Sequence, residues 1–279
     1  ALKKLNLKYN EPDLKSWNVF LDRYKNPKGT VKIGLIGKYI ELQDSYKSIL
    51  ESFIHAGAVN EVRVEVTPVH SEHINQKNVE EKLNSFHGIL VAPGFGERGI
   101  EGKIEAIKYV RTNKIPFFGI CYGMQMAIIE FARNELNIKK ATSSEFDKKG
   151  IPIIGLITEW KKDGRIIKGT DKDLGGTMRL GSYDAKLKDD SLVKKIYRKS
   201  LIKERHRHRY EVNIAYKEKF EKKGMSFSGL SPDNTLPEII ELKNHPWFVG
   251  VQFHPEFKSR PLAPHPLFSS FIKAAKNHK

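Results

Sequence analysis

Hydrophobic positions in the first half of the chain alternate between two periods. Short continuous apolar runs are typical of strands buried on both faces of a parallel sheet, and apolar residues three or four positions apart are typical of helices. The pattern predicts strands at residues 31–37, 62–69, 88–93 and 116–121, and helices at residues 45–56, 79–86, 104–111 and 124–136. This alternation predicts an α/β fold, a parallel sheet covered by helices with ligands at the carboxyl ends of its strands.

The pattern changes at both ends of this region. From about residue 150 the candidate strands are shorter and more polar, at residues 151–157, 177–183, 210–214, 225–230, 238–242 and 248–253, with helices at residues 192–198 and 267–275. Residues 1–29 are polar, contain Pro12 and Pro27, and end at Gly29. They are interpreted as a linker with a helical turn around residues 14–24.

Composition narrows the class of protein. The chain has 279 residues, 39% of them hydrophobic, which suits a soluble globular core. A single cysteine excludes an intramolecular disulfide and fits a reducing cytosol. No apolar run reaches 18 residues, so we expect a cytoplasmic protein with no membrane partner.

The net charge of +16 raises the question of an acidic partner. The lysines are scattered and often adjoin glutamates, which favours a solvated surface. The basic cluster from Arg205 to Arg209 alternates with the period of a strand and has no interleaved aromatic residues for base stacking. We therefore expect no nucleic-acid partner, and nucleotides or an acidic partner surface are the remaining candidates for a role of the charge.

The only cysteine lies where a strand pattern runs into a helix pattern, in Gly119-Ile-Cys-Tyr-Gly123. A nucleophile on a sharp turn between strand and helix is exposed, and the helix N-terminus directs backbone N–H groups at developing negative charge. Cys121 is therefore a candidate thiolate nucleophile. Taken alone, a cysteine in an apolar strand is more often a small core residue.

A second motif, Gly250-Val-Gln-Phe-His-Pro-Glu256, supplies a candidate base and its orienting group. In an extended chain, residues two positions apart point to the same side. His254 is therefore predicted to face Cys121 as the base, with Glu256 fixing the imidazole tautomer and orientation.

The loop Ala92-Pro-Gly-Phe-Gly-Glu-Arg-Gly99 follows a predicted strand. Its glycines let the backbone approach a ligand closely. An N–H near Gly94, together with the N–H of Tyr122, would form an oxyanion hole. Pro93 has no N–H, so the hole must use Gly94 or a later amide. A phosphate-binding loop is the rival interpretation, but the Lys-Ser or Lys-Thr ending is missing; a plain turn is the other alternative.

Together these two motifs resemble the class I glutamine amidotransferases, which are Cys-His-Glu glutaminases on a flavodoxin-like sheet. Five further segments narrow the resemblance to the CTP synthase family: Gly99-Ile-Glu-Gly-Lys103, Ser143-Ser-Glu-Phe146, Gly175-Gly-Thr-Met-Arg-Leu-Gly181, Glu204-Arg-His-Arg-His-Arg-Tyr-Glu-Val-Asn213 and His254-Pro-Glu-Phe-Lys-Ser-Arg-Pro261. The implied fold is a central, mostly parallel sheet flanked by helices, with additional smaller antiparallel strands.

The resemblance implies a role for each matching residue. Cys121 would attack the side-chain amide of L-glutamine, His254 would transfer the proton to the leaving ammonia, and Glu256 would orient His254. The implied glutamine-binding residues are Gly94, Tyr122, Gly123, Met124, Gln125, Glu145 and Arg209. A carboxylate suits the substrate ammonium group, and a guanidinium suits its carboxylate.

The resemblance also implies what surrounds this domain. Residues 30–279 would be the glutaminase domain and residues 1–29 an interdomain linker, while the family's N-terminal synthetase domain has no counterpart in this sequence. The glutaminase domain needs no metal or other cofactor. ATP and Mg²⁺ belong to the synthetase domain, which aminates UTP to CTP with the released ammonia. GTP would activate the full enzyme, which would be a homotetramer.

Two other functions are compatible with the motifs. A γ-glutamyl peptidase or another cysteine peptidase on the same fold would prefer glutamyl peptides to free glutamine. A catalytically silent binding module would keep the fold and show no thiolate reactivity.

Overall fold

The computed structural model describes residues 2–8, 10, 12–156, 159–162, 165–168 and 178–278, with the backbone alone at residues 43, 159–162 and 165–168. Two positions of the expected strands, Ile157 and Thr177, lie outside the described residues. So do residues 175–177 of the segment that ends at Gly181.

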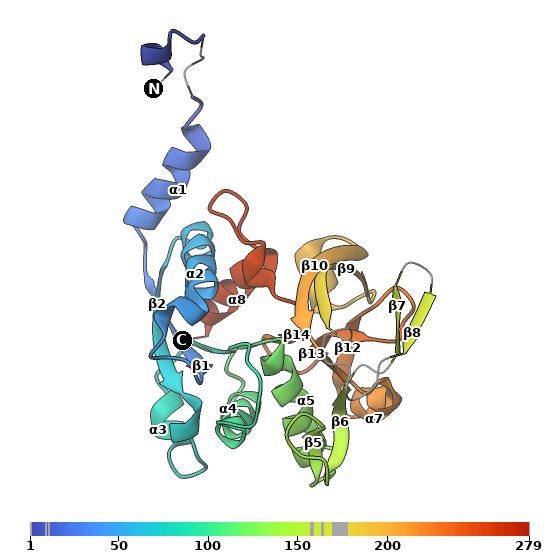
Figure 1. The fold of residues 1–279 in the computed structure, drawn as a ribbon. Helices are drawn as coiled ribbons and strands as arrows, with labels where there is room; N and C mark the ends of the chain where they lie inside the picture. The colour runs from blue at the N-terminus through green and yellow to red at the C-terminus, as the bar shows by residue number, and fades with distance from the viewer. Residues whose placement is uncertain are drawn as a thin grey trace.

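A central sheet organises the fold (Figure 1). In the described part of the chain it has nine strands in the order β10-β9-β12-β13-β14-β4-β3-β1-β2. The strands are β1 (Thr30–Gly37), β2 (Arg63–His70), β3 (Gly88–Val91), β4 (Phe117–Ile120), β9 (Arg179–Leu187), β10 (Leu201–His208), β12 (Met225–Leu230), β13 (Pro237–Leu242) and β14 (Phe248–Val251).

One half of this sheet is parallel and the other half is antiparallel. β14, β4, β3, β1 and β2 pair in parallel, whereas the pairs from β14 out to β10 are antiparallel. The α/β class is confirmed, but the sheet is mixed rather than mostly parallel. Of the shorter, more polar strands expected after residue 150, those at β9, β12, β13 and β14 belong to this central sheet, because β14 pairs with β4 on one side and with β13 on the other.

Helices cover both faces of the sheet and enclose two apolar cores. One core joins the sheet to α3 (Val79–Leu83), α4 (Ile100–Thr112) and α5 (Tyr122–Asn134). The other joins it to α2 (Lys47–Val59), α6 (Leu192–Tyr197) and α8 (Pro266–Asn277). β1, β3 and β4 read as continuous apolar runs because they are covered on both faces.

Smaller elements attach beside α5. A second sheet has the order β11-β6-β5 and contains β5 (Ala141–Ser143), β6 (Ile151–Leu156) and β11 (Tyr210–Val212). β7 (Glu159–Lys162) and β8 (Arg165–Lys168) form an antiparallel hairpin. α7 (Lys217–Lys222) packs against β12. Short 3₁₀ turns occur at Lys3–Leu5, Gln43–Tyr46, Ser71–His73, Ile214–Tyr216 and Pro255–Phe257.

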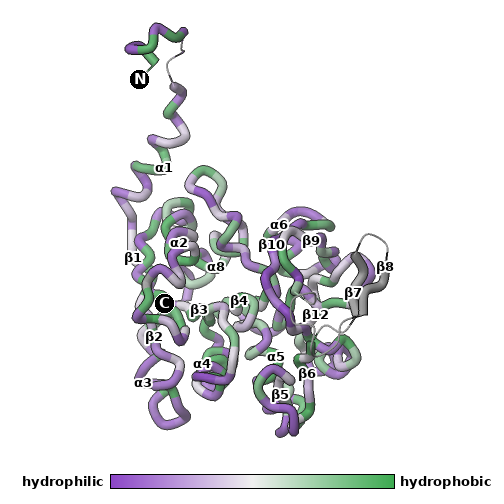
Figure 2. The backbone as a smooth tube through the Cα atoms, in the orientation of Figure 1, coloured by the Kyte–Doolittle hydropathy of each residue, from purple (hydrophilic) through white to green (hydrophobic). Residues whose placement is uncertain are grey.

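The N-terminal helix extends away from the body and contacts it through α2, where the Phe20 ring lies 6.4 Å from that of His55. α1 (Lys15–Lys25) projects away from the sheet with hydrophilic positions recurring along it, as Figures 1 and 2 show, and it buries no side chain. The predicted helical turn is confirmed. None of the helices in the described ranges combines the length and apolarity needed to cross a membrane.

Candidate active site

Cys121 occupies a strained turn between β4 and α5. Its φ of 52° and ψ of −101° lie outside the regions that residues with a side chain normally adopt. Such strain persists only where the surroundings enforce it, and it is common at catalytic nucleophiles. Here the backbone N–H of Cys121 donates to the carbonyl oxygen of Val251 at 2.7 Å, which ties the turn to β14. The predicted strand–turn–helix setting is confirmed.

The two flanking glycines are needed for close approach of the backbone. A Cβ added at Gly123 would lie 2.3 Å from the carbonyl oxygen of Val91. A Cβ added at Gly119 would lie 2.8 Å from the backbone carbon of Gly123. Because both obstacles are main-chain atoms, neither can move aside easily. The glycines therefore allow α5 to start directly above the end of the sheet.

The amide groups next to the sulfur suit a developing oxyanion. As the first residue of α5, Tyr122 has no acceptor for its N–H within the helix. Gly94 lies opposite, and a Cβ added there would be 3.7 Å from the ring of Tyr122. Gly96 donates its own N–H to Glu145 Oε1 at 2.6 Å, so that amide is already used. The candidate second donor is therefore the N–H of Gly94 or of Phe95.

His254 and Glu256 meet as predicted, but through a different backbone geometry. Nδ1 of His254 and Oε1 of Glu256 are 2.7 Å apart. β14 ends at Val251, and residues Pro255–Phe257 form a 3₁₀ turn, so the extended-strand explanation of this contact was wrong. Pro255 favours the turn by fixing φ at its first position. Phe257, which belongs to the quoted segment from His254 to Pro261 but was given no role from the sequence, stacks on the His254 ring with 5.1 Å between centroids.

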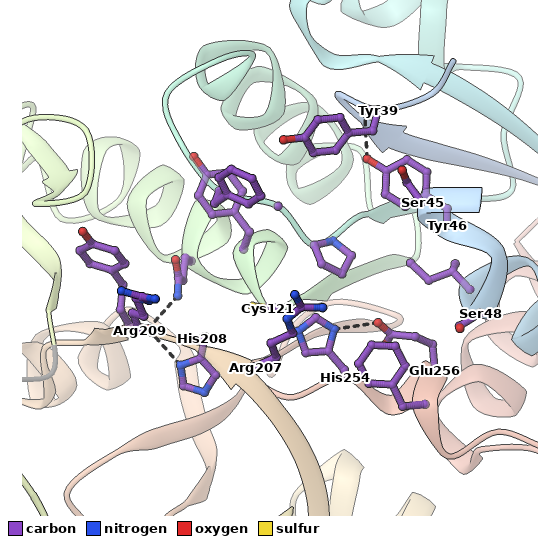
Figure 3. A pocket seen from close by; sticks show the side chains of 18 of the residues that line it. Tyr39, Ser45, Tyr46, Ser48, Cys121, Arg207, His208, Arg209, His254 and Glu256 are labelled. Carbon is purple, nitrogen blue, oxygen red and sulfur yellow. Dashed lines mark hydrogen bonds and ion pairs between the residues drawn. The ribbon is translucent and has the colours of Figure 1, made fainter. Parts of the chain in front are cut away.

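The electrostatics favour a protonated imidazole beside the sulfur. Burial alone would lower the pKa of His254, but the Cys121 sulfur and then the Glu256 carboxylate outweigh it and raise the pKa to about 10. The buried Nε2 of His254 has no hydrogen-bond partner among the described residues. The sulfur of Cys121 therefore acts on this imidazole mainly through its charge. Figure 3 shows His254 between Cys121 and Glu256.

These three side chains open into a cavity of about 740 Å³, which is large enough for an amino acid and an attached group. Figure 3 shows the residues at its wall. The lining includes Gly94, Cys121, Tyr122, Gln125, Glu145, Arg207, His208, Arg209, His254, Glu256 and Phe257. The structure thus brings together eight of the ten residues expected at the site. Gly123 packs against Val91, and Met124 is buried in the apolar core, so their side-chain positions lie outside the cavity wall.

The cavity wall carries one acidic and one basic side chain, which suit the ammonium group and the carboxylate of a free amino acid. Glu145 lines it, and burial raises the pKa of this carboxyl, against the opposing effects of the Gly96 N–H and Lys38. Arg209 also lines it and forms no ion pair within the described residues. Gln125 donates its amide hydrogens to the carbonyl of Tyr210 at 3.0 Å and to Gln252 at 3.2 Å. Only its Oε1 therefore remains for a ligand, and this atom can only accept.

A buried polar cluster lies below Arg209. Most of its residues fall in segments that carry the family resemblance, but nothing in the sequence predicted that they are buried together. β10 alternates exposed and buried positions, so His206 and His208 are buried while Arg205 and Arg207 are exposed, the latter at the cavity wall. The predicted strand-like alternation is confirmed, although β10 itself was not among the expected strands. Nδ1 of His206 and Nε2 of His208 are 2.9 Å apart, and burial lowers the pKa of both rings.

The charge of this cluster is balanced by one arginine and two carboxylates. Arg179 donates to Glu211 and to Glu238, each at 2.8 Å. Burial raises the pKa of Glu211 to about 8 despite Arg179, so one of the two carboxyls can hold a proton at neutral pH. The cluster supports the cavity floor from β9, β11 and β13. Within the described residues, no group of three or more His, Cys, Asp or Glu side chains could hold a metal ion.

Comparison with known proteins gives consistent matches. The family Glutamine amidotransferase class-I matches residues 41–274. The CTP synthase of Pelagibacter ubique (strain HTCC1062) is 68% identical over 280 residues, covering 100% of this chain and 52% of that protein. The CTP synthase of Flavobacterium johnsoniae is 57% identical over 282 residues, covering 100% and 51%. The chain thus spans about half the length of these relatives.

A solved structure is similar over the same region. The glutaminase domain of Trypanosoma brucei CTPS, determined with bound acivicin, superposes with a TM-score of 0.80 and is 36% identical. The match covers 89% of this chain and 95% of the trypanosomal one.

Proposed function

The chain belongs to the class I glutamine amidotransferase family and corresponds to the glutaminase half of the CTP synthases, and from that membership we propose how its cavity works. Glutamine binds with its ammonium group at Glu145 and its carboxylate at Arg209. Its side-chain amide then reaches Cys121. The observation that carries the proposal is the triad of Cys121, His254 and Glu256 in one cavity with these two opposite charges.

The reaction follows from the proton positions. The Cys121 thiolate attacks the amide carbon, and the N–H groups of Tyr122 and Gly94 or Phe95 stabilise the oxyanion. His254 gives its proton to the departing nitrogen, which leaves as ammonia, and a γ-glutamyl thioester remains on the sulfur. His254 then accepts a proton from water, which attacks the thioester and releases glutamate. Glu256 keeps Nδ1 protonated so that Nε2 performs both transfers.

The ammonia is proposed to serve a synthetase domain that aminates UTP to CTP with ATP and Mg²⁺. That domain would be the main partner of this chain, in a tetramer activated by GTP. Residues 1–29 are proposed to be the linker to it and residues 30–279 the glutaminase domain. The projection of α1 away from the body, with no buried side chain, supports a linking role.

The test is ammonia release from L-glutamine by the chain and by its Cys121→Ala variant, with a γ-glutamyl dipeptide as the competing substrate. We expect ammonia from glutamine with the wild type only, and faster turnover when GTP and the synthetase half are supplied. Preferential cleavage of the dipeptide would identify a peptidase instead. No hydrolysis of either substrate, together with a thiol that alkylates at an ordinary rate, would indicate a binding module.

A further inference from the structure

Gln252 lies directly behind the sulfur of Cys121 and has no role in the mechanism above. It is fully buried and follows the last residue of β14. Its backbone N–H donates to the carbonyl of Glu238 at 2.9 Å, so its position is anchored from β13. Its side-chain Nε2 donates to Cys121 Sγ at 3.6 Å. This contact comes from a group that cannot exchange the proton, unlike His254.

A hydrogen-bond relay fixes which end of each amide faces the sulfur. The carbonyl of Tyr210 can only accept, so Gln125 must present its NH₂ group to it. The same nitrogen is 3.2 Å from Gln252 Oε1 and donates its second hydrogen there. Since Gln252 uses its oxygen for Gln125, its NH₂ group must face Cys121. The orientation follows from donor and acceptor chemistry alone.

We infer that Gln252 is a further catalytic residue, whose side-chain amide donates a hydrogen bond to the Cys121 thiolate and holds the sulfur toward the substrate. A hydrogen bond to an ionised acceptor is stronger than a hydrogen bond between neutral groups. The bond from Gln252 therefore favours the thiolate form of Cys121 over the thiol. It acts on the sulfur alongside His254. The two groups have separate roles, because His254 moves the proton and Gln252 stabilises the charge that remains.

The relay also connects the nucleophile to the substrate-binding end of the cavity, a step that rests on the proposed function. Gln125 retains only Oε1 for a ligand, which suits an ammonium donor near Glu145. Hydrogen bonds in a chain polarise one another. An ammonium group at Gln125 Oε1 would therefore strengthen the donation from Gln125 to Gln252 and from Gln252 to the sulfur.

The alternative is that Gln252 is a structural core residue, because any buried amide needs hydrogen-bond partners. Both roles predict lower stability when the amide is removed. Only the catalytic role predicts a change in the ionisation of the thiol. Cys121 is the only cysteine in the chain, so alkylation by iodoacetamide reports this sulfur without interference.

The experiment measures the alkylation rate against pH for the wild type and Gln252→Met, which keeps the length and volume but has no donor. We expect the pH at which alkylation reaches half of its maximal rate to rise by about one unit in the variant. At pH values below this midpoint the rate should fall about tenfold, which is the effect of losing one hydrogen bond to a charged group. The plateau at high pH should hold or rise, because a more basic thiolate is the stronger nucleophile. The variant should also lower kcat for glutamine more than it changes KM.

Asn60→Leu provides the matched control. The side-chain amide of Asn60 donates to two backbone carbonyls, of Ala56 at 2.8 Å and Ser269 at 2.9 Å, away from the cavity. We expect this variant to melt at a lower temperature with an unchanged alkylation midpoint. Should Gln252→Met fail to fold, Gln252→Leu gives the same comparison, and Gln125→Met removes the relay while leaving Gln252 in place.

The outcomes separate this inference from the proposed function, because alkylation needs no glutamine. A Gln252→Met midpoint equal to the wild type, with only the melting temperature lowered, would overturn the catalytic role. A shifted midpoint in a chain that releases no ammonia would retain the thiolate donor and remove the glutaminase assignment.

Discussion

Replacing Glu256 by glutamine tests how much of the catalytic power depends on a charge rather than on orientation. The substitution keeps the shape of the side chain and an oxygen that can accept from Nδ1 of His254 at 2.7 Å, but removes the negative charge. Both His254 and Glu256 are buried, so water screens the loss poorly. The imidazolium of His254 thereby loses the charge of Glu256 and keeps that of the Cys121 sulfur.

The magnitude follows from the contributions to the pKa of His254. The Cys121 sulfur raises this pKa more than Glu256 does, so the raised value of about 10 falls only partly when Glu256 is neutralised. Exchanging a charged for a neutral hydrogen bond costs about 1–1.5 kcal/mol. This corresponds to a loss of about 5–15-fold in kcat/KM. Glu256→Ala, which removes the orienting oxygen as well, should lose about a hundredfold or more.

The assay is ammonia release from glutamine at several pH values, with the fraction of folded protein measured in parallel. Glu130→Gln is the control, because Glu130 is also buried and accepts from Arg111 through two bonds of 2.8 Å, but lies outside the cavity wall. It should lower stability and leave turnover per folded molecule unchanged. Full activity in Glu256→Gln, or a loss as complete as in Cys121→Ala, would refute this division between charge and orientation.

Three further outcomes follow from the same geometry. Gly123→Ala should reduce the free energy of unfolding, measured in urea, by about 1–3 kcal/mol, because the added Cβ would lie 2.3 Å from the Val91 carbonyl oxygen. Unchanged stability would mean that the turn can relax. Glu145→Gln should raise KM for glutamine about tenfold with a smaller change in kcat, as expected when a hydrogen bond to a charged group is lost. In the wild type, KM should rise as pH falls through the raised pKa of Glu145, since the neutral acid no longer attracts the substrate ammonium group. His254, with a pKa of about 10 when folded and near 6.5 when unfolded, should contribute stability that is complete below pH 6.5 and is lost as pH rises through about 10. A His254→Gln variant, measured by urea unfolding across that range, should lack this part of the dependence.

Local patterns in the sequence predict the parallel half of the fold well, because each buried strand and amphipathic helix there carries its own period. The strands at β1, β3 and β4 and the nucleophile turn at Cys121 are confirmed within a few residues. The expected helix after Cys121 begins two residues earlier than predicted, at Tyr122. This start places the first free amide of α5 directly beside the sulfur.

In the antiparallel half the expected strands at β9, β12, β13 and β14 are confirmed within a few residues, but β10 was missed because its buried side is polar. β10 buries His206, His208 and Glu204, residue types that a hydrophobic pattern assigns to the surface. They are buried in a network that depends on partners from other strands, such as Arg179 of β9 and its two carboxylates. Such partners are chosen by the tertiary structure, so a one-dimensional pattern cannot identify this strand as a layer of the core.

The candidate site itself depends on strand register more than on any single motif. β4 and β14 pair in parallel with Ile120 opposite Val251, so the residues that follow them, Cys121 and Gln252, emerge side by side although they are 131 positions apart. A shift of one residue in this pairing would turn Gln252 to the opposite face and remove its contact with the sulfur. The bond from the Cys121 N–H to the Val251 carbonyl opposes that shift, since it joins the last residue of β14 to the residue that follows β4. The strain at Cys121 and the alignment of its catalytic partners thus share one cause, the register between two neighbouring strands.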